Sequence, residues 1–390
     1  MHKNILTKKT FTVNNWHHYF RYDTLYKKGV LIFIVFFSIL IFSRADIKSL
    51  NISSGMEYDT LHYPEEKHFS NVLQLTNGGD NAEAYFSYDG KYLVFQKTNV
   101  KEKILCDQIY VTKIPAAGEK IVPKLVSTGK GRTTCGFFTR DNKHIIYAST
   151  HLSSVDCPPV PDRNVLKRYI WPIYSSYDIF MSDLNGKIVK RLTKTPGYDA
   201  EASLSPDGKK MLFTSIRDGD LDLYCMDLKS GKTKRITSEL GYDGGAWFSP
   251  DGKKIVWRAS RPKTDAEIKD YKDLLLQGLV APTNMEVYVA NADGSDSKQI
   301  TSLGQANWAP NFTPDGNKII FCSNHAYKRG FPFNMYLMDL DGNGLERISR
   351  DNGFDAFPMF SPDRKKIVFC SNRNNGGTRD TNIFLADWVK

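Results

Sequence analysis

The sequence of 390 residues lacks the short motifs by which common enzymes are identified. It contains no G-x-S-x-G nucleophile turn, no H-E-x-x-H zinc motif and no Walker A phosphate loop. Its eight histidines are scattered, without the spacing that metal ligands require. The sequence therefore predicts no metal site, no cofactor and no catalytic residue.

No apolar run reaches the length of about 20 residues that a membrane-spanning helix needs. The longest, residues 30–42, follows Lys27 and Lys28 and precedes "SRA" at residues 43–45. A positive flank, a short apolar core and small residues predict a signal peptide within residues 1–45, with an uncleaved membrane anchor as the alternative. Both interpretations place the rest of the chain in the periplasm or another extracytoplasmic compartment, with membrane contact only through the N-terminal segment.

An excess of one charge is also missing from most of the chain. The formal net charge is +10 at pH 7, but residues 1–45 hold seven basic residues against one acidic residue. The remainder is close to balance and mixes both signs evenly. This pattern does not predict a nucleic-acid partner.

The chain has only six cysteines, too few to predict a disulfide scaffold. Three lie in apolar strand-like runs and are expected to be buried: Cys225, Cys322 and Cys370. The other three have more polar surroundings: Cys106, Cys135 and Cys157. One pair among these three is expected to bridge in an oxidising compartment, with Cys106–Cys135 or Cys135–Cys157 favoured.

What the sequence does contain is one ten-residue pattern, repeated. "FSPDGKKIVW" begins at residue 248, close copies begin at 204, 312 and 360, and weaker copies begin at 86 and 138. In "PDG", proline presets a turn, aspartate bonds its own backbone and glycine accepts a positive φ, so the pattern predicts a hairpin. The six copies are anchored by Asp89, Asp141, Asp207, Asp251, Asp315 and Asp363.

Each repeat contains four short strand-like segments separated by turn residues. In residues 198–237 these are "YDAEASLS", "KKMLFTSIR", "LDLYCMDL" and "KRIT". Successive anchors are 52, 66, 44, 64 and 48 residues apart, which leaves room for four strands and loops of variable length. Six such units predict an all-β fold, a six-bladed β-propeller with four-stranded antiparallel blades.

The last unit has no fourth strand, whereas "VLQLT" at residues 72–76 matches the fourth-strand pattern and precedes the first unit. We therefore expect residues 72–76 to complete the last blade by pairing with the strand around Ile383–Leu385. This pairing would close the ring and cover both open edges. The propeller would then span residues 72–390, after a linker at residues 46–71.

Two insertions, at residues 150–176 and 260–284, are expected on the same face of the propeller, opposite the "PDG" turns. In a four-stranded blade, the loop between the second and third strands lies on that face. Long loops on a rigid scaffold commonly carry binding sites. Tyr169, Trp171 and Tyr174 are candidate aromatic anchors for a partner, with ordinary loop packing as the alternative.

Aligning the six units predicts polar rings near the channel mouth on this decorated face. Six residues before the residue that precedes each "PDG"-type turn, such as Ser205 in "SPDG", stand Asn81, Thr133, Asp199, Asp243, Asn307 and Asp355. Two positions later, Glu83 and Glu201 add carboxylates. The second strands end at Asn99, His151, Arg217, Arg261, His325 and Arg373.

These rings have two interpretations. In the first, Asp199 with Arg217, Asp243 with Arg261 and Asp355 with Arg373 form ion pairs between blades. In the second, a rim of mixed charge binds a partner through Asp199, Glu201, Asp243, Asp355, Arg217, Arg261, His325 and Arg373.

The units "SPDGKKI.F.S.R" and "D..G....R.T" resemble the propeller repeats of the TolB family of periplasmic proteins. The resemblance covers residues 72–390. Residues 197–224 are also similar to TolB-like propellers of unassigned function from Bacteroidetes-type bacteria. TolB itself carries an α/β domain before its propeller, and residues 46–71 are too few to form one.

The resemblance implies an exported binding module that recognises a protein or peptide partner at the bacterial cell envelope, such as an envelope lipoprotein or a peptidase. One alternative is a hydrolase or lyase at the channel mouth that uses Asp199, Glu201, Asp243 and His325. Another is a scaffold subunit that accompanies a separate peptidase or an envelope complex.

Overall fold

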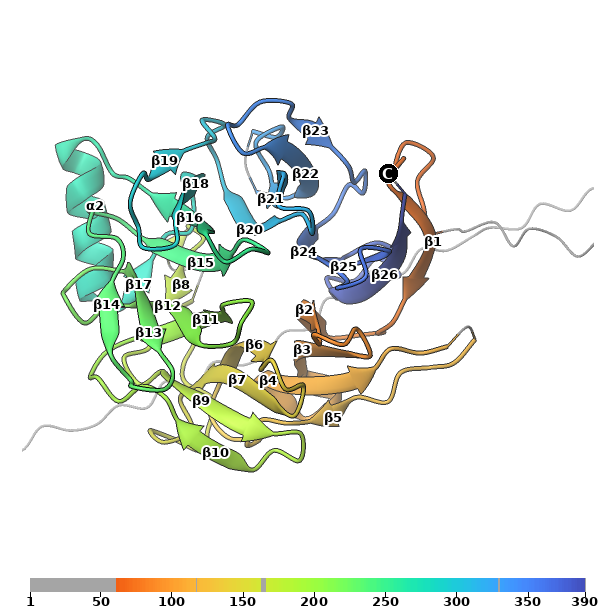
Figure 1. The fold of residues 1–390 in the computed structure, drawn as a ribbon, viewed down its shortest axis with the longest axis horizontal. Helices are drawn as coiled ribbons and strands as arrows, with labels where there is room; N and C mark the ends of the chain where they lie inside the picture. The colour runs from red at the N-terminus through yellow and green to blue at the C-terminus, as the bar shows by residue number, and fades with distance from the viewer. Residues whose placement is uncertain (1–60, 117, 163–165, 329, 390) are drawn as a thin grey trace, which may run out of the picture. The chain divides into compact units, whose positions relative to one another are not determined.

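The fold is a ring of six antiparallel sheets. A computed structural model describes residues 61–116, 118–162, 166–328 and 330–389. Each sheet has four strands, and the sheets stand around a central axis as blades (Figure 1). The predicted six-bladed β-propeller is confirmed. The predicted signal peptide or anchor, residues 1–45, lies outside the described residues.

The strands follow the chain from one blade to the next. Blade 1 contains β2 (Asp80–Phe86), β3 (Tyr92–Asn99), β4 (Ile104–Lys113) and β5 (Lys124–Leu125), with the 3₁₀ helix η1 (Val100–Glu102) after β3. Blade 2 contains β6 (Thr133–Phe138), β7 (His144–Ser149), β9 (Asp178–Asp183) and β10 (Ile188–Arg191). Blade 3 contains β11 (Asp199–Leu204), β12 (Lys210–Ser215), β13 (Asp222–Asp227) and β14 (Thr233–Arg235). Blade 4 contains β15 (Asp243–Phe248), β16 (Lys254–Ser260), β18 (Met285–Asn291) and β19 (Lys298–Gln299). Blade 5 contains β20 (Asn307–Phe312), β21 (Lys318–Ser323), β22 (Asn334–Asp339) and β23 (Glu346–Arg347). Blade 6 contains β24 (Asp355–Phe360), β25 (Lys366–Ser371), β26 (Asn382–Trp388) and β1 (Phe69–Gln74).

Blade 6 is built from both ends of the described chain. Strand β1 pairs antiparallel with β26, with Leu73 opposite Leu385, and Figure 1 shows the orange β1 along the dark blue β26. The N–H of Leu75 donates a hydrogen bond to the carbonyl oxygen of Ile383 at 2.7 Å. The predicted ring closure is confirmed, and the pairing leaves β26 without an open edge.

Residues just before β1 stabilise the ring closure further. Glu66, in the segment interpreted as a linker, is fully buried and accepts a hydrogen bond from Arg373 at 2.9 Å. Arg373 is itself buried and also reaches Asp355 at 3.1 Å. The hydroxyl of Tyr63 donates to Asp351 at 2.5 Å. A charged cluster therefore joins the N-terminal segment to blade 6.

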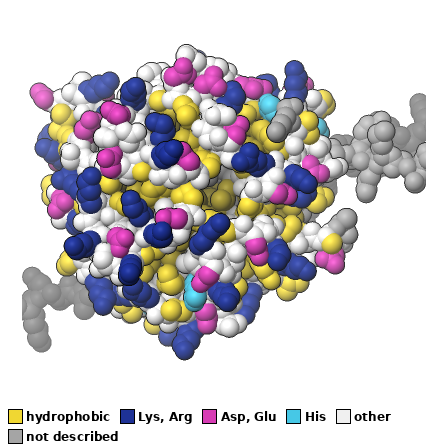
Figure 2. Space-filling view, in the orientation of Figure 1, with side chains coloured by type: hydrophobic (Ala, Val, Ile, Leu, Met, Phe, Trp, Pro, Cys, Tyr) yellow, Lys and Arg dark blue, Asp and Glu magenta, His cyan; other side chains and the backbone are white. Residues whose placement is uncertain are grey.

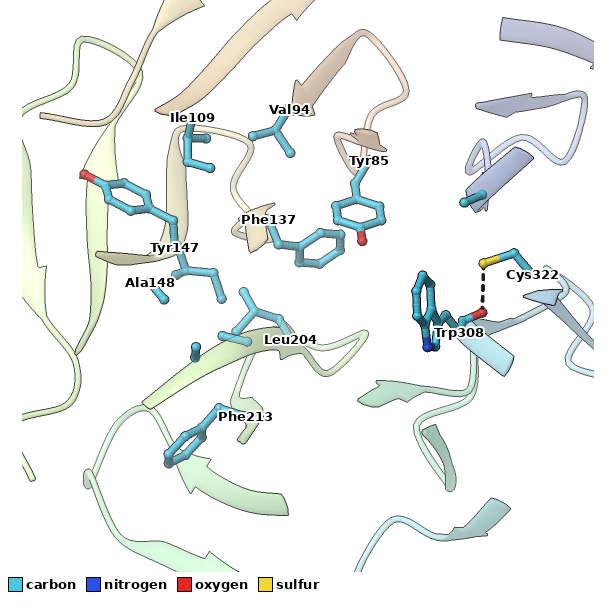
Figure 3. Packing of buried hydrophobic residues seen from close by; sticks show 14 of the residues in the cluster. Tyr85, Val94, Ile109, Phe137, Tyr147, Ala148, Leu204, Phe213, Trp308 and Cys322 are labelled. Atoms are coloured by element: carbon cyan, nitrogen blue, oxygen red, sulfur yellow. Dashed lines mark hydrogen bonds between the residues drawn. The ribbon is translucent and has the colours of Figure 1, made fainter. Parts of the chain in front are cut away.

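The core between blades repeats with the sequence. The second strand of every blade places an aromatic ring at the same position, and each is almost completely buried: Phe95, Tyr147, Phe213, Trp257, Phe321 and Phe369. The innermost strands add side chains that point toward the axis. Figure 3 shows Tyr85, Phe137 and Leu204, from three different blades, directed into the same space. Large buried rings dominate the packing energy of such a core.

The two insertions contact each other. Within the first, β8 (Trp171–Pro172) pairs antiparallel with β17 (Leu279–Val280) of the second. The second also contains α2 (Asp265–Leu276), which begins with a capping box formed by Thr264 and Glu267. Arg168 of the first insertion binds Asp270 of α2 through two hydrogen bonds of 2.7 and 2.8 Å. The insertions thus form one platform, on the face opposite the "PDG" turns.

No helix among the described residues has the length and apolar character needed to cross a lipid bilayer.

We expect the Glu66→Ala variant to lose about 3 kcal/mol of unfolding free energy, because it removes one partner of a buried charge cluster. Urea unfolding of the purified protein measures this loss. Glu65→Ala is the matched control, since Glu65 is the exposed neighbour. A loss below about 0.5 kcal/mol for Glu66→Ala, the size of an ordinary surface change, would show that this cluster does not fasten the ring.

Candidate functional site

A β-bulge interrupts the innermost strand of every blade at the same place. The bulge puts one residue per blade into the left-handed region, with φ between 49° and 62°. These six residues line the channel: Glu83, Cys135, Glu201, Gly245, Ala309 and Phe357. Five of the six are not glycine, so the conformation is unfavourable for them. Such strain, held in place by the surrounding fold, is characteristic of functional sites.

The six bulge residues surround a cavity of about 380 Å³. This volume lies within the range of small-molecule sites, roughly 300–1,000 Å³. Aromatic side chains from the strands complete the wall, among them Tyr85, Tyr198 and Trp247. The lining includes Val160 of the first insertion, which is 57% exposed, so the cavity reaches the surface beside that insertion. Figure 2 shows hydrophobic side chains gathered around the middle of the face in view.

A buried ion pair crosses the cavity wall from blade 3 to blade 4. Arg258 Nη2 donates to Glu201 Oε1 and to the Tyr242 hydroxyl oxygen, each at 2.9 Å. The other carboxylate oxygen of Glu201 accepts from the Gly245 N–H at 2.6 Å. The Tyr242 hydroxyl in turn donates to Glu201. The Nε of Arg258 is buried and has no hydrogen-bond partner within the described parts of the chain.

The sequence "DGG" at residues 243–245 makes room for this pair. A Cβ on Gly245 would lie 2.0 Å from Arg258 Nη1, and one on Gly244 would lie 2.3 Å from Glu201 Oε2. Gly245 also has a φ of 62°, which glycine accepts without steric cost. The paired glycines were the signal in the sequence that a bulky group approaches the backbone here.

Glu83 also faces the cavity, and no cationic side chain among the described residues forms an ion pair with it. Its side chain is half-buried, and the part that stays accessible faces the cavity. Burial raises the pKa of the Glu83 carboxyl to about 7, while a hydrogen bond from Cys135 opposes the rise. The Glu201 carboxylate raises this pKa further and the Arg258 charge lowers it. A carboxyl with such a pKa changes charge near neutral pH.

The predicted rim residues form ion pairs, but within blades. Asp199 binds Arg217 at 2.9 Å, Asp243 binds Arg261 at 2.7 Å, and the Asp355–Arg373 pair was described above. Each aspartate begins the first strand of its blade, and its arginine follows the second strand of the same blade. The expectation of pairs between blades is therefore wrong, because adjacent antiparallel strands bring these two positions together first.

Most of the predicted rim residues turn away from the cavity. Arg217 lies over the Tyr224 ring and Arg261 over the Tyr288 ring, in the outer part of their own blades. His325 Nδ1 bonds the Ser323 hydroxyl at 3.0 Å. Of the eight rim residues, only Glu201 lines the cavity. The structure therefore does not gather Asp199, Glu201, Asp243 and His325 around one chamber.

The predicted aromatic anchors face inward. Trp171 lies 5.4 Å from the Arg258 guanidinium and 5.2 Å from the Trp308 ring, and its Nε1 donates to the Tyr169 hydroxyl at 3.0 Å. The Tyr174 hydroxyl donates to the Pro159 carbonyl oxygen at 2.7 Å. All three line the cavity. These three side chains therefore cover the cavity, whereas a partner-binding anchor would project into solvent.

A disulfide joins Cys106 of β4 to Cys157 of the first insertion, with their Cα atoms 5.9 Å apart. The prediction that one pair among the three candidate cysteines bridges is confirmed, but both favoured pairings included Cys135, which is a free thiol, and are wrong. Cys135 is the bulge residue of blade 2, with a φ of 53°, and its side chain faces the channel. Burial raises the pKa of its thiol well above the usual range. Cys322 and Cys370 are buried and Cys225 is half-buried.

Within the described ranges, no group of three or more His, Cys, Asp or Glu side chains is placed to hold a metal ion.

Comparison with known proteins identifies the repeat. Residues 173–281 and 280–380 match the sequence model described as the TolB beta propeller domain. No curated protein matches the chain significantly. Among solved structures, a putative TolB from Agrobacterium tumefaciens is 21% identical, with a TM-score of 0.51 over 82% of this chain and 97% of that one. At this identity, the likeness shows the fold alone.

Two further structures are more distant. TolB from Acinetobacter baumannii is 20% identical, with a TM-score of 0.49 over 79% of this chain and 63% of that one. An oligogalacturonate lyase in complex with manganese is 16% identical, with a TM-score of 0.47 over 82% of this chain and 93% of that one. Neither score is high enough to bear on function.

We expect Asp243→Ala to cost about 3 kcal/mol of unfolding free energy, because Arg261 and the Trp257 Nε1–H then lose their buried acceptor. Asp273→Ala is the control, because it removes an exposed pair with Lys269 and should cost under about 1 kcal/mol. Denaturant unfolding of both variants makes the comparison. Equal losses in the two would show that the rim pairs do not stabilise the blades.

The disulfide closes a loop with a sequence separation of 51 residues, so we expect Cys157→Ser to destabilise the protein by roughly 2–4 kcal/mol. Thermal unfolding with and without reductant measures the effect. Reductant should lower the melting temperature of the wild type and leave that of the variant unchanged. Peptide mapping of the oxidised protein should find Cys106 linked to Cys157 and Cys135 as a free thiol. A bridge that includes Cys135 would contradict the assignment.

Proposed function

The chain belongs to the TolB β-propeller family, and on that premise we propose that it is an exported binding module for a protein or peptide partner at the bacterial cell envelope. The observation that carries the proposal is the platform formed by the two insertions. Strands β8 and β17 and helix α2 make one extended surface on a single face of the ring. Long loops held on a rigid scaffold are where binding surfaces commonly lie.

The platform also presents apolar side chains to solvent. Leu276 at the end of α2 is 87% exposed, and Val155 and Leu152 of the first insertion are 63% and 58% exposed. Burial of such side chains against another protein would be favourable, because apolar surface would leave water. The opposite face offers tight turns whose polar groups bond within the turn, as Ser205 bonds Asp207 at 2.6 Å.

Export has independent support in the chain. The N-terminal pattern of basic residues, a short apolar run and small residues is that of a secreted protein. The Cys106–Cys157 disulfide suits an oxidising compartment. Together they support a location outside the cytoplasm, where a lipoprotein or a peptidase of the envelope is a suitable partner.

A binding role agrees better with the channel than the proposed hydrolase or lyase does. Glu201 is held by four donors, namely the Arg258 guanidinium, the Tyr242 and Thr214 hydroxyls and the Gly245 N–H. These contacts tie the Glu201 carboxylate to groups of the cavity wall itself, so its oxygens are already engaged within the fold. The remaining residues of the hydrolase or lyase proposal lie outside the cavity lining.

The proposal predicts which face contacts the partner. A photo-reactive amino acid placed at Leu276 or Val155 should cross-link a specific envelope protein, whereas the same group at Lys209 or Asn317, beside the "PDG" turns, should not. With the partner purified, Leu276→Asp should weaken its binding at least about tenfold, because a charge enters an apolar contact. Lys209→Asp is the control, and neither exposed substitution should change the melting temperature.

The opposite pattern would overturn the proposal: cross-links only from the turn face, or unchanged affinity in Leu276→Asp.

A further inference from the structure

The cavity wall holds one charge without a counter-charge. Its charged residues are Glu83, Asp107, Arg132, Glu201 and Arg258. Arg132 binds Asp107, and Arg258 binds Glu201. No cationic side chain among the described residues pairs with Glu83, whose hydrogen bond comes from the Cys135 thiol. When Glu83 is ionised, the chamber therefore carries one uncompensated negative charge.

A buried carboxylate without a cation is costly, and proteins normally avoid it by protonation or by pairing. The strand geometry here prevents Glu83 from turning outward, because its backbone is held in the bulge with a φ of 52°. Its side chain is thus directed into a cavity that a ligand can reach.

The wall around Glu83 is aromatic. Tyr85 lies two residues along the same strand, and its ring lies 5.0 Å from the ring of Trp247, which belongs to blade 4. Figure 3 shows Tyr85 directed toward the middle of the ring. Aromatic faces attract cations, especially in a site shielded from water. The same chamber already holds one cation in this way, since Arg258 lies 5.4 Å from the Trp171 ring and 5.2 Å from the Tyr242 ring.

We propose that the channel contains a ligand site at Glu83 that takes the ammonium group of an organic amine, with the apolar part of that amine against Tyr85 and Trp247. A metal ion does not suit the position, because only one carboxylate is free and the neighbouring groups are aromatic rings. A neutral or anionic ligand would leave the Glu83 charge unpaired. The ammonium carrier is a free amine, or the amino terminus or a lysine of a bound peptide.

This site stands on its own residues and does not require that the platform bind a protein partner. Small amines alone test it, so its failure and the failure of the proposed function are distinguishable.

The charge of Glu83 should make binding depend on pH. The titratable and charged groups that act on it are Tyr85, Asp107, Cys135, Glu201, Arg258 and Cys370. Because its pKa is raised to about 7, Glu83 is mostly protonated at pH 6 and mostly ionised at pH 8. An alkylammonium ion, with a pKa near that of lysine, about 10.4, stays charged across this range. Amine affinity should therefore rise about tenfold from pH 6 to pH 8.

The first experiment uses the whole exported protein and two probes of similar shape. Isothermal titration calorimetry at pH 8 should detect binding of 2-phenylethylamine and at least tenfold weaker binding of 2-phenylethanol, which lacks the charge. Equal binding of the alcohol, or no binding of either probe, overturns the proposal without any variant.

The second experiment changes the carboxyl. Glu83→Gln keeps the shape and should abolish both the preference for the amine and its pH dependence. Glu65→Gln, at an exposed position outside the channel, should bind like the wild type. Amine binding that is unchanged in Glu83→Gln contradicts the assignment.

A stability measurement separates a ligand site from a structural role. The raised pKa of Glu83 means that its protonated form stabilises the fold at low pH, and that this stabilisation is lost as the pH rises through about 7. Glu83→Gln should therefore melt at a higher temperature than the wild type at pH 8. At pH 5, where Glu83 is protonated, the two proteins should melt at similar temperatures. A lower melting temperature at pH 8 would show that the Glu83 charge is needed by the fold, against the proposal.

A third comparison identifies the ammonium carrier. Alanyl-phenylalanine amide offers an amino terminus, and N-acetyl-lysine amide offers a side-chain ammonium. Preference for either over 2-phenylethylamine assigns the site to that part of a peptide, while preference for 2-phenylethylamine assigns it to a free amine. Failure of all three to compete with one another overturns the single-site proposal.

Discussion

Closure of the ring is the constraint on which the rest of the structure depends. Six blades meet around one axis only if the last blade finds a fourth strand, and β1 supplies it by pairing with β26. The buried Glu66–Arg373–Asp355 cluster adds charge pairing at the same joint. Once the ring is closed, the six innermost strands can only converge on the axis. The channel, its mouth and the face that carries the insertions all follow from that geometry.

A bulge in each innermost strand then determines which side chains line the channel. A regular strand would alternate its side chains between the two neighbouring blades, whereas the bulge turns one residue per blade toward the axis. Glycine at this position in blade 4 admits Arg258, which neutralises Glu201. Glu83, at the same position in blade 1, has no equivalent partner in the part of the chain that the structure describes. The insertion residues Tyr169, Trp171 and Tyr174 cover the chamber, so a group within it is shielded from bulk water.

Repetition made the fold predictable. The "PDG" turns, the four strand-like segments per unit and the orphan strand at residues 72–76 were enough to predict six blades and their closure. The alignment of units also singled out Glu83 and Glu201 at one position. It did not reveal that this position is a bulge, because a two-against-one register leaves no mark on strand periodicity.

Two further features of the site were not predicted from the sequence. Cys135 was favoured as a disulfide partner, whereas the bulge turns its side chain into the channel and Cys106 bridges to Cys157. A binding rim was one of two interpretations of the arginines after the second strands; Arg217 and Arg261 each pair with an aspartate of their own blade and lie over the rings of Tyr224 and Tyr288. The pairing of β8 with β17 joins residues more than a hundred positions apart. Both strands have only two residues, too few to show a strand pattern in the sequence.

Glu83 is a carboxyl without a cationic partner among the described residues, in a chamber that a ligand can reach. Carbon-13 NMR of the glutamate carboxyls, assigned with Glu83→Gln, measures its titration directly. We predict a midpoint near pH 7 in the free protein and a midpoint well below this with saturating 2-phenylethylamine, because a bound cation favours the ionised form. A midpoint near the ordinary glutamate value of about 4.3, unchanged by the amine, would contradict it.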